Sequence, residues 1–97
     1  MGFAVKLHRL ASKALAKLPK VTQEEIRDLI DGLAKDPWPD GVLKIPLSGP
    51  LNNFVKIRVG DYRLAYKIDK GQVVVLVMVI GDRKEVYRLL KQVAGMK

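Results

Sequence analysis

The sequence lacks cysteine altogether and contains a single histidine, His8, among its 97 residues. Disulfides, thiolate nucleophiles and cysteine metal sites are therefore excluded, and a reducing compartment is the default expectation. One histidine can form neither a histidine pair nor a metal cluster, so we expect no metal site and no cofactor. His8 falls at a predicted strand-to-helix junction, where we expect it to be structural.

Long apolar runs are also missing. The longest run, 73–80, is far too short to cross a bilayer. The chain does not open with a signal-peptide apolar region, and Lys6 occupies a position where a myristoylation signal requires serine or threonine. The sequence therefore predicts a cytoplasmic protein with no membrane partner.

Acidic residues are scarce relative to basic ones. The chain has 18 Lys and Arg against 10 Asp and Glu, which gives a net charge of +8 and a pI of about 9.9. This balance favours polyanionic partners: nucleic acid, an acidic protein or, less readily, an anionic membrane. A hydrophobic content of 48% is ordinary for a folded chain, and the length allows one domain, 1–97.

The most informative segment, 54–68, alternates apolar and polar residues as a β-hairpin does, with a Gly-Asp dipeptide at its turn. This turn places Arg58 opposite Arg63, with Lys56 and Lys67 on the same face. Like charges directly opposite each other destabilise a sheet by up to about 1 kcal/mol. Because no acidic residue joins this face, it predicts an anionic ligand.

The remaining elements are predicted from hydrophobic spacing and from the residues that end them. They are a strand at 3–7, a helix at 9–18, a helix from a capping box of Thr22 and Glu25 to Asp36, an edge strand at 43–47, a buried strand at 72–80 and a helix at 84–93. Their order indicates an α+β fold. We expect an antiparallel sheet of four or five strands, with the N-terminal helical hairpin packed on it and a short C-terminal helix. Trp38, between two prolines, is expected to fix its loop to the second helix.

Pairing of the buried strand with the hairpin brings its end beside Arg58 and Arg63, which adds Arg83 and, four residues later, Tyr87 to the cluster. Arginine binds phosphate in bidentate geometry, and one donor aimed at developing charge contributes about 3 kcal/mol. The neighbouring arginines disfavour the ammonium form of Lys56, which suits this lysine to act as a base. Such a cluster favours metal-independent cleavage of RNA through the ribose 2′-hydroxyl.

The runs KIRVGDYRLAY (56–66) and GDRKEVY (81–87) resemble the RelE/ParE toxin superfamily, and the similarity covers nearly the whole chain. The resemblance implies one RelE-like toxin domain of a type II toxin–antitoxin system. It also implies a RelB-like antitoxin as cognate partner, in a heterotetramer. RelE-type toxins cut mRNA in the ribosomal decoding site, whereas ParE-type toxins inhibit DNA gyrase and generally lack the basic catalytic set.

The RelE pattern implies a role for each residue of the basic cluster. Lys56 is implied as the base, Arg63 as the group that stabilises the scissile phosphate, and Arg83 as an aid to the leaving group. Tyr87 is implied to orient the mRNA or to stack on it. Arg58 stands where the RelE prototype has lysine, so it can clamp phosphate but hardly act as a base.

Two further departures concern the segment from Asp82 to Tyr87. Asp82 replaces a histidine that many relatives carry, and its role is open. The segment between Arg83 and Tyr87 is also shorter than in the prototype.

The sequence leaves several alternatives open. The cations of the hairpin can form a merely solvated face, and Arg83 can simply pair with Asp82 or Glu85. Ribosomal RNA contacts are expected from further lysines, although these also suit an ordinary polar surface: Lys13, Lys17, Lys44 and Lys67. The leading hypothesis is a ribosome-dependent endoribonuclease; the alternatives are a ParE-like gyrase inhibitor and a non-catalytic ribosome- or RNA-binding domain.

Overall fold

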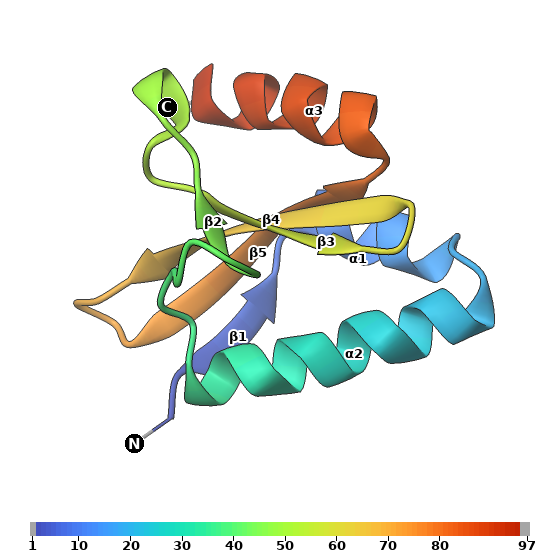
Figure 1. The fold of residues 1–97 in the computed structure, drawn as a ribbon, viewed down its shortest axis with the longest axis horizontal. Helices are drawn as coiled ribbons and strands as arrows, with labels where there is room; N and C mark the ends of the chain where they lie inside the picture. The colour runs from blue at the N-terminus through green and yellow to red at the C-terminus, as the bar shows by residue number, and fades with distance from the viewer. Residues whose placement is uncertain (1, 96–97) are drawn as a thin grey trace.

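The structure, a computed structural model, describes residues 2–95. Its elements, in chain order, are β1 (Ala4–Leu7), α1 (Arg9–Ala16), α2 (Lys20–Lys35), β2 (Ile45–Pro46), the 3-10 helix η1 (Gly49–Leu51), β3 (Val55–Val59), β4 (Tyr62–Asp69), β5 (Val74–Gly81) and α3 (Arg83–Gly95) (Figure 1). The predicted order of strands and helices is confirmed. No helix within residues 2–95 is both long enough and apolar enough to cross a membrane.

The strands form one five-stranded sheet in the order β1-β5-β4-β3-β2. The pairs β2–β3, β3–β4 and β4–β5 are antiparallel, as the sequence predicts. β1 instead runs parallel to β5, with Ala4 opposite Val74, so the sheet is mixed. No short turn joins these two strands, and therefore no local pattern fixes their relative direction.

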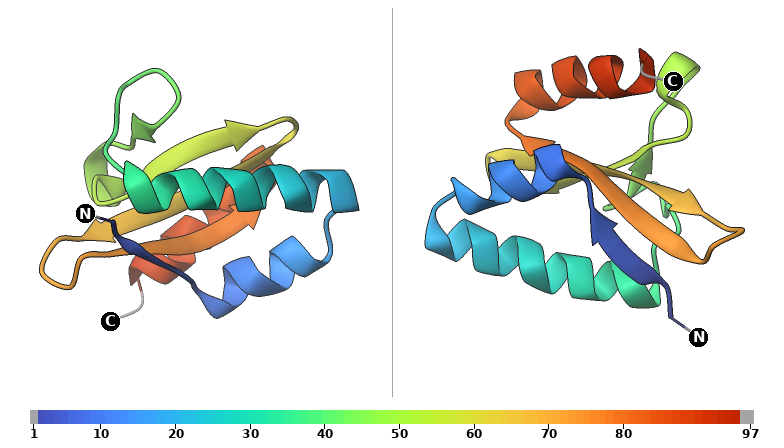
Figure 2. Two further views of the ribbon diagram at one scale, coloured as in Figure 1. Left: turned by 90° about the horizontal axis from the view of Figure 1, so that it is seen from below. Right: turned by 180° about the vertical axis from the view of Figure 1, so that it is seen from behind.

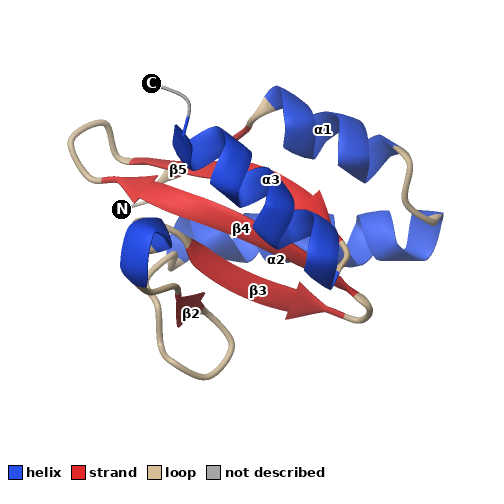
Figure 3. Cartoon of the chain, turned by 90° about the horizontal axis from the view of Figure 1, so that it is seen from above, coloured by secondary structure: helices blue, strands red, loops and turns tan. Residues whose placement is uncertain are grey.

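The sheet separates two apolar cores. α1 and α2 cover one face and α3 covers the other (Figures 1, 2 and 3). Ile26 and Leu33 of α2 pack with Tyr66 in the larger core, whereas Val86 and Leu90 of α3 pack in the smaller one. β5 is almost wholly buried because both of its faces are covered, which confirms its reading as an inner strand.

The β3–β4 hairpin has the predicted register. Arg58 is opposite Arg63 and Lys56 is opposite Ala65. Gly60, at the turn, has a φ of 60°, a left-handed conformation that suits glycine. Next to the hairpin turn, β4 places Arg63 beside Gly81, the last residue of β5. The hairpin turn and the start of α3 therefore lie at the same end of the sheet (Figure 1).

The predicted capping box at Thr22 is wrong, because α2 begins at Lys20 with Pro19 as its N-cap and no side-chain cap. The Pro19 carbonyl accepts the first helical hydrogen bond from Gln23 N. The side chain of Gln23 reaches back and donates to the carbonyl of Leu18 at 2.9 Å. The turn between the helices is thus closed by proline and glutamine rather than by the Thr-x-x-Glu pattern.

The loop between α2 and β2 also differs from expectation. Only Ile45 and Pro46 of the predicted strand 43–47 pair with β3, although they do so at the sheet edge as expected. Asp40 accounts for the shortening, because its Oδ1 accepts three backbone N–H groups, from Val42 to Lys44. These bonds hold the loop in a turn and also keep the pKa of Asp40 below its usual value.

Trp38, expected to fix its loop to α2, donates its backbone N–H to Asp36, the C-cap residue of that helix. Its ring packs edge-on against Phe3, with ring centroids 5.7 Å apart. The buried residue of this loop is Pro37, whose carbonyl accepts a 2.7 Å hydrogen bond from the hydroxyl of Tyr66. The loop is therefore anchored to the sheet and to the segment before β1.

Candidate functional site

Lys56 and Tyr87 are in direct contact. Lys56 lies in β3 on the face of the sheet that α3 covers, and Tyr87 lies one turn into α3. The ammonium Nζ donates to the Tyr87 hydroxyl at 2.9 Å and lies 5.6 Å from the centroid of its ring. Both side chains are half-buried. This contact fixes the ammonium of Lys56 at the margin of α3.

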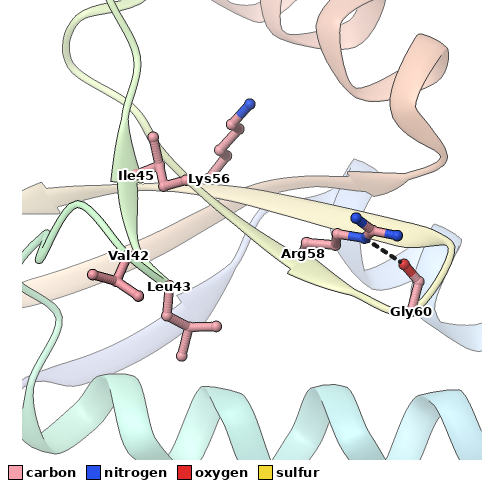
Figure 4. A pocket seen from close by; sticks show the side chains of 6 residues that line it. All are labelled: Val42, Leu43, Ile45, Lys56, Arg58 and Gly60. Carbon is pink, nitrogen blue, oxygen red and sulfur yellow. Dashed lines mark hydrogen bonds between the residues drawn. The ribbon is translucent and has the colours of Figure 1, made fainter.

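Arg58 and Arg63 face each other across the hairpin, next to its turn. Arg58 donates from Nε to the carbonyl of Gly60 at 3.1 Å, which holds the side chain against its own turn (Figure 4). Nε is thereby occupied, while the two terminal nitrogens of the guanidinium are hydrogen-bonded to nothing within residues 2–95. Those nitrogens are the fork that binds a phosphate in bidentate geometry.

Arg83 is the first residue of α3, and Asp82 determines where that helix starts. Asp82 Oδ1 accepts the backbone N–H of Glu85 at 2.8 Å, and its carbonyl accepts that of Val86. Asp82 is thus the N-cap of α3, a position for which aspartate is among the preferred residues. The bond from Glu85 also holds the pKa of the Asp82 carboxyl below its usual value. This finding gives Asp82 the structural role that the sequence left open.

The cations of the cluster are not neutralised by nearby carboxylates. The one ion pair among residues 2–95 joins Lys44 to Asp36, at 3.8 Å, away from the cluster. Arg83 forms no ion pair with Asp82 or Glu85, so the alternative that it serves only to pair with one of them is wrong. Within the same residues, no group of three or more histidines, aspartates and glutamates is placed to hold a metal ion.

A hollow of about 450 Å³ adjoins Lys56 and Arg58. Its other wall consists of Val42 and Leu43, on the loop that leads into β2, and of Ile45 in β2 itself, and Figure 4 shows these three side chains. Val42 is 85% exposed, which is unusual for valine. The hollow therefore combines a cationic wall with an apolar one.

The additional lysines do not gather at one place. Lys13 in α1 and Lys17, the C-cap residue of that helix, are both exposed. Lys44 is already engaged, since its Nζ donates to the Asp36 carbonyl at 2.6 Å and its side chain is only 15% exposed. Lys67 lies near the far end of β4 from the hairpin turn.

Sequence reasoning missed two parts of the site. The apolar wall of Val42, Leu43 and Ile45 could not be predicted, because the sequence does not show whether a given apolar side chain is exposed or buried. The contact between Lys56 and Tyr87 depends on how α3 crosses the sheet, which no spacing within either element reveals. Their presence in one cluster was predicted, but their hydrogen bond was not.

Comparison with known proteins assigns this chain to a family. The family model described as "ParE toxin of type II toxin-antitoxin system, parDE" matches residues 5–87. A protein assigned as toxin RelE1 in Methanocaldococcus jannaschii is 24% identical over 88 residues, which cover 91% of this chain and 98% of that protein.

Solved structures agree with this assignment. The toxin–antitoxin complex RelBE2 of Mycobacterium tuberculosis matches with a TM-score of 0.74 and 25% identity, over 86% of this chain and all of the other. A free double arginine-to-alanine mutant of E. coli toxin RelE matches in fold with a TM-score of 0.80 at 24% identity, over 95% and 97% of the two chains. The chain therefore belongs to the ParE toxin family of type II toxin–antitoxin systems, within the RelE/ParE superfamily.

Proposed function

We propose that this toxin is an endoribonuclease that cleaves mRNA in the decoding site of the ribosome. The observation that carries the proposal is the set of cations at one end of the sheet, none of which is paired with a carboxylate within residues 2–95. Lys56 within this set is held by Tyr87. A toxin that only binds a protein surface has no need of such a concentration of positive charge.

Each residue has a chemical task in this proposal. Lys56 removes the proton from a ribose 2′-hydroxyl, and the resulting oxygen attacks the adjacent phosphorus. The bond from phosphorus to the 5′-oxygen breaks as the new bond forms. Arg58 and Arg63 bind the non-bridging oxygens, on which negative charge accumulates. The products are a 2′,3′-cyclic phosphate and a 5′-hydroxyl end.

Arg83 and Tyr87 act on the other groups of the substrate. Arg83, at the start of α3, faces the charge that develops on the 5′-oxygen, which takes its proton from water. Tyr87 holds Lys56 through its hydroxyl and offers its ring to a base. The reaction requires no metal ion, because cationic side chains supply the positive field.

The ribosome supplies what the chain lacks. With one candidate base, the toxin depends on its host to align the 2′-hydroxyl with the phosphorus, and alignment alone contributes several kcal/mol. Lys13, Lys17 and Lys67 are proposed to contact ribosomal RNA. Lys44 contributes little to this surface, because it is engaged by Asp36. A RelB-like antitoxin is the proposed partner that neutralises the toxin, in a heterotetramer.

The test is a cleavage assay on programmed ribosomes. Purified toxin is incubated with ribosomes that hold a defined mRNA, and the mRNA ends are mapped by primer extension. Cuts within the decoding-site codon, absent from naked mRNA and lost in Arg83→Ala, are expected. Intact mRNA, together with inhibition of supercoiling in a parallel DNA gyrase assay, would identify a ParE-like inhibitor instead.

A further inference from the structure

A second concave surface lies at the end of the β3–β4 hairpin that is opposite to its turn. It consists of two adjoining hollows of about 340 and 410 Å³, which share Asn53, Ile68 and Lys70. Trp38 lines the first hollow and Lys67 the second. None of the five candidate catalytic residues lines either one. We call this surface the Trp38 hollow.

Trp38 provides an aromatic platform at the rim of the hollow. It is the only tryptophan of the chain, and it is 44% exposed. The edge-to-face contact with Phe3 fixes the orientation of the ring at an interplanar angle of 81°. The ammonium of Lys70 lies 5.5 Å from the ring centroid, in a cation–π contact. Phe3 therefore holds the ring in place, and the ammonium of Lys70 lies over its face.

Polar groups suited to a base and a phosphate surround this platform. Asn52 and Asn53 line the hollow, and neither amide side chain is hydrogen-bonded within residues 2–95. Asparagine amides match the edges of nucleobases. Lys67 and Lys70 provide two positive charges for a phosphate.

The carboxylates at this end of the molecule are already engaged. Asp69 accepts the backbone N–H of Gln72 at 3.1 Å. Asp36 accepts the backbone N–H of Trp38 and pairs with Lys44. Asp40 accepts three backbone N–H groups. These donors offset part of the negative charge that would otherwise oppose an anionic ligand.

We propose that the Trp38 hollow binds one nucleotide of a single-stranded nucleic acid. The base stacks on Trp38 and displaces the ammonium of Lys70, which turns to the phosphate together with Lys67. Asn52 and Asn53 donate to or accept from the edge of the base. Base–aromatic stacking of this kind is a standard feature of single-strand binding and tolerates any base. The site is separate from the cleavage cluster and does not depend on its activity.

Trp38 itself reports on the binding, because tryptophan-selective emission comes from this residue alone. The full chain is titrated with oligouridylate, with oligothymidylate and with oligoglutamate as an anion without bases. Quenching by oligouridylate is the expected result, and it persists when Lys56→Gln and Arg83→Gln disable the cluster. Oligothymidylate tells whether the ligand is RNA or any single strand; either result supports a nucleotide site.

Variants are then compared by the anisotropy of a labelled oligouridylate. Trp38→Ala is expected to weaken binding about tenfold, and Trp38→Tyr, which keeps an aromatic ring, to restore most of the affinity. Lys70→Gln weakens binding more than the matched charge change Lys20→Gln, at the N-terminus of α2. Unquenched emission at saturating oligouridylate would overturn the proposal, as would equal quenching by oligoglutamate or equal effects of the two lysine variants.

Discussion

At the scale of single residues, the central feature is the hydrogen bond between Lys56 and Tyr87. The alternation of β3 was enough to predict that Lys56 and Arg58 share a face, because side chains alternate along a strand. It was not enough to predict that Tyr87 contacts Lys56, since that contact is set by the packing of α3. The sequence predicts that both residues belong to the cluster, but their contact could be known only from the tertiary structure.

Replacing Lys56 by glutamine removes the proposed base while keeping an uncharged polar side chain at the position. The cleavage rate on programmed ribosomes should fall at least about 100-fold, the usual lower range for loss of general base catalysis. Lys6→Gln, an equal charge change at an exposed position of β1, is the control and should leave the rate unchanged. A Lys56→Gln variant as active as this control would exclude Lys56 as the base.

Replacing Tyr87 separates the contribution of its ring from that of its hydroxyl. Tyr87→Phe loses the 2.9 Å bond to Lys56 but keeps the ring beneath the ammonium. We expect this variant to cleave more slowly than the native toxin and faster than Tyr87→Ala, in single-turnover assays. Equal rates for all three proteins would show that Tyr87 takes no part.

Tyr66 makes stability sensitive to alkaline pH. Burial raises the pKa of its hydroxyl above the usual value of 10.0. The unfolded chain therefore loses the phenol proton first, so the stabilisation present below pH 10 is lost as the pH rises toward the higher folded-state pKa. Tyr66→Phe should flatten this loss in denaturant unfolding measured from neutral to alkaline pH.

The same substitution has a cost at neutral pH. It leaves the buried carbonyl of Pro37 without its donor, and should lower the free energy of unfolding by about 1–2 kcal/mol. An unchanged stability at neutral pH, or an unchanged alkaline loss, would contradict the assigned role of this hydroxyl.

At the scale of elements, the caps show what a sequence pattern can and cannot predict. Thr22 and Glu25 match a capping box, yet α2 begins earlier, at Lys20, because Pro19 is already extended and closes the turn. Asp82 is the opposite case. Its part in the reaction was left open at the sequence level, and the structure shows that it accepts the Glu85 N–H at the start of α3.

The cap at Asp82 predicts a contrast between two substitutions. Asp82→Asn keeps an acceptor for the Glu85 N–H and should retain most of the cleavage activity, whereas Asp82→Ala loosens the first turn of α3 and displaces Arg83. Hydrogen exchange of the first-turn amides should be faster in the alanine variant. If Asp82→Asn abolished cleavage while these amides stayed protected, the carboxylate would have a chemical role instead.

Acid should loosen the same turn in the native chain. The folded-state pKa of Asp82 lies below its usual value of 3.8, so the stabilisation is complete above that pH and is lost as the pH falls through the lower value. Asp82→Asn should remove this acid dependence from the exchange of the Glu85 amide. An identical acid dependence in both proteins would assign the effect to another carboxyl.

At the scale of the whole molecule, the fold was predictable wherever short turns connect neighbouring strands. The hairpin turn fixes the register of β3 and β4, and three of the four strand pairs follow from the order of elements. The parallel pairing of β1 with β5 was not predictable in this way, because its partners are brought together by helix packing. The exposure of Val42 and Leu43 was likewise not predictable, because it depends on how the loop before β2 lies at the edge of the folded sheet.

The measurement that tests the central claim most directly uses an mRNA with a single 2′-deoxynucleotide immediately 5′ of the mapped cleavage site. The substrate is presented on programmed ribosomes beside its all-ribose counterpart, and product ends are analysed. The account predicts that the all-ribose mRNA yields a 2′,3′-cyclic phosphate and that the single deoxy substitution abolishes cleavage at that site. Cleavage of the deoxy substrate at an unchanged rate would contradict attack by the 2′-hydroxyl.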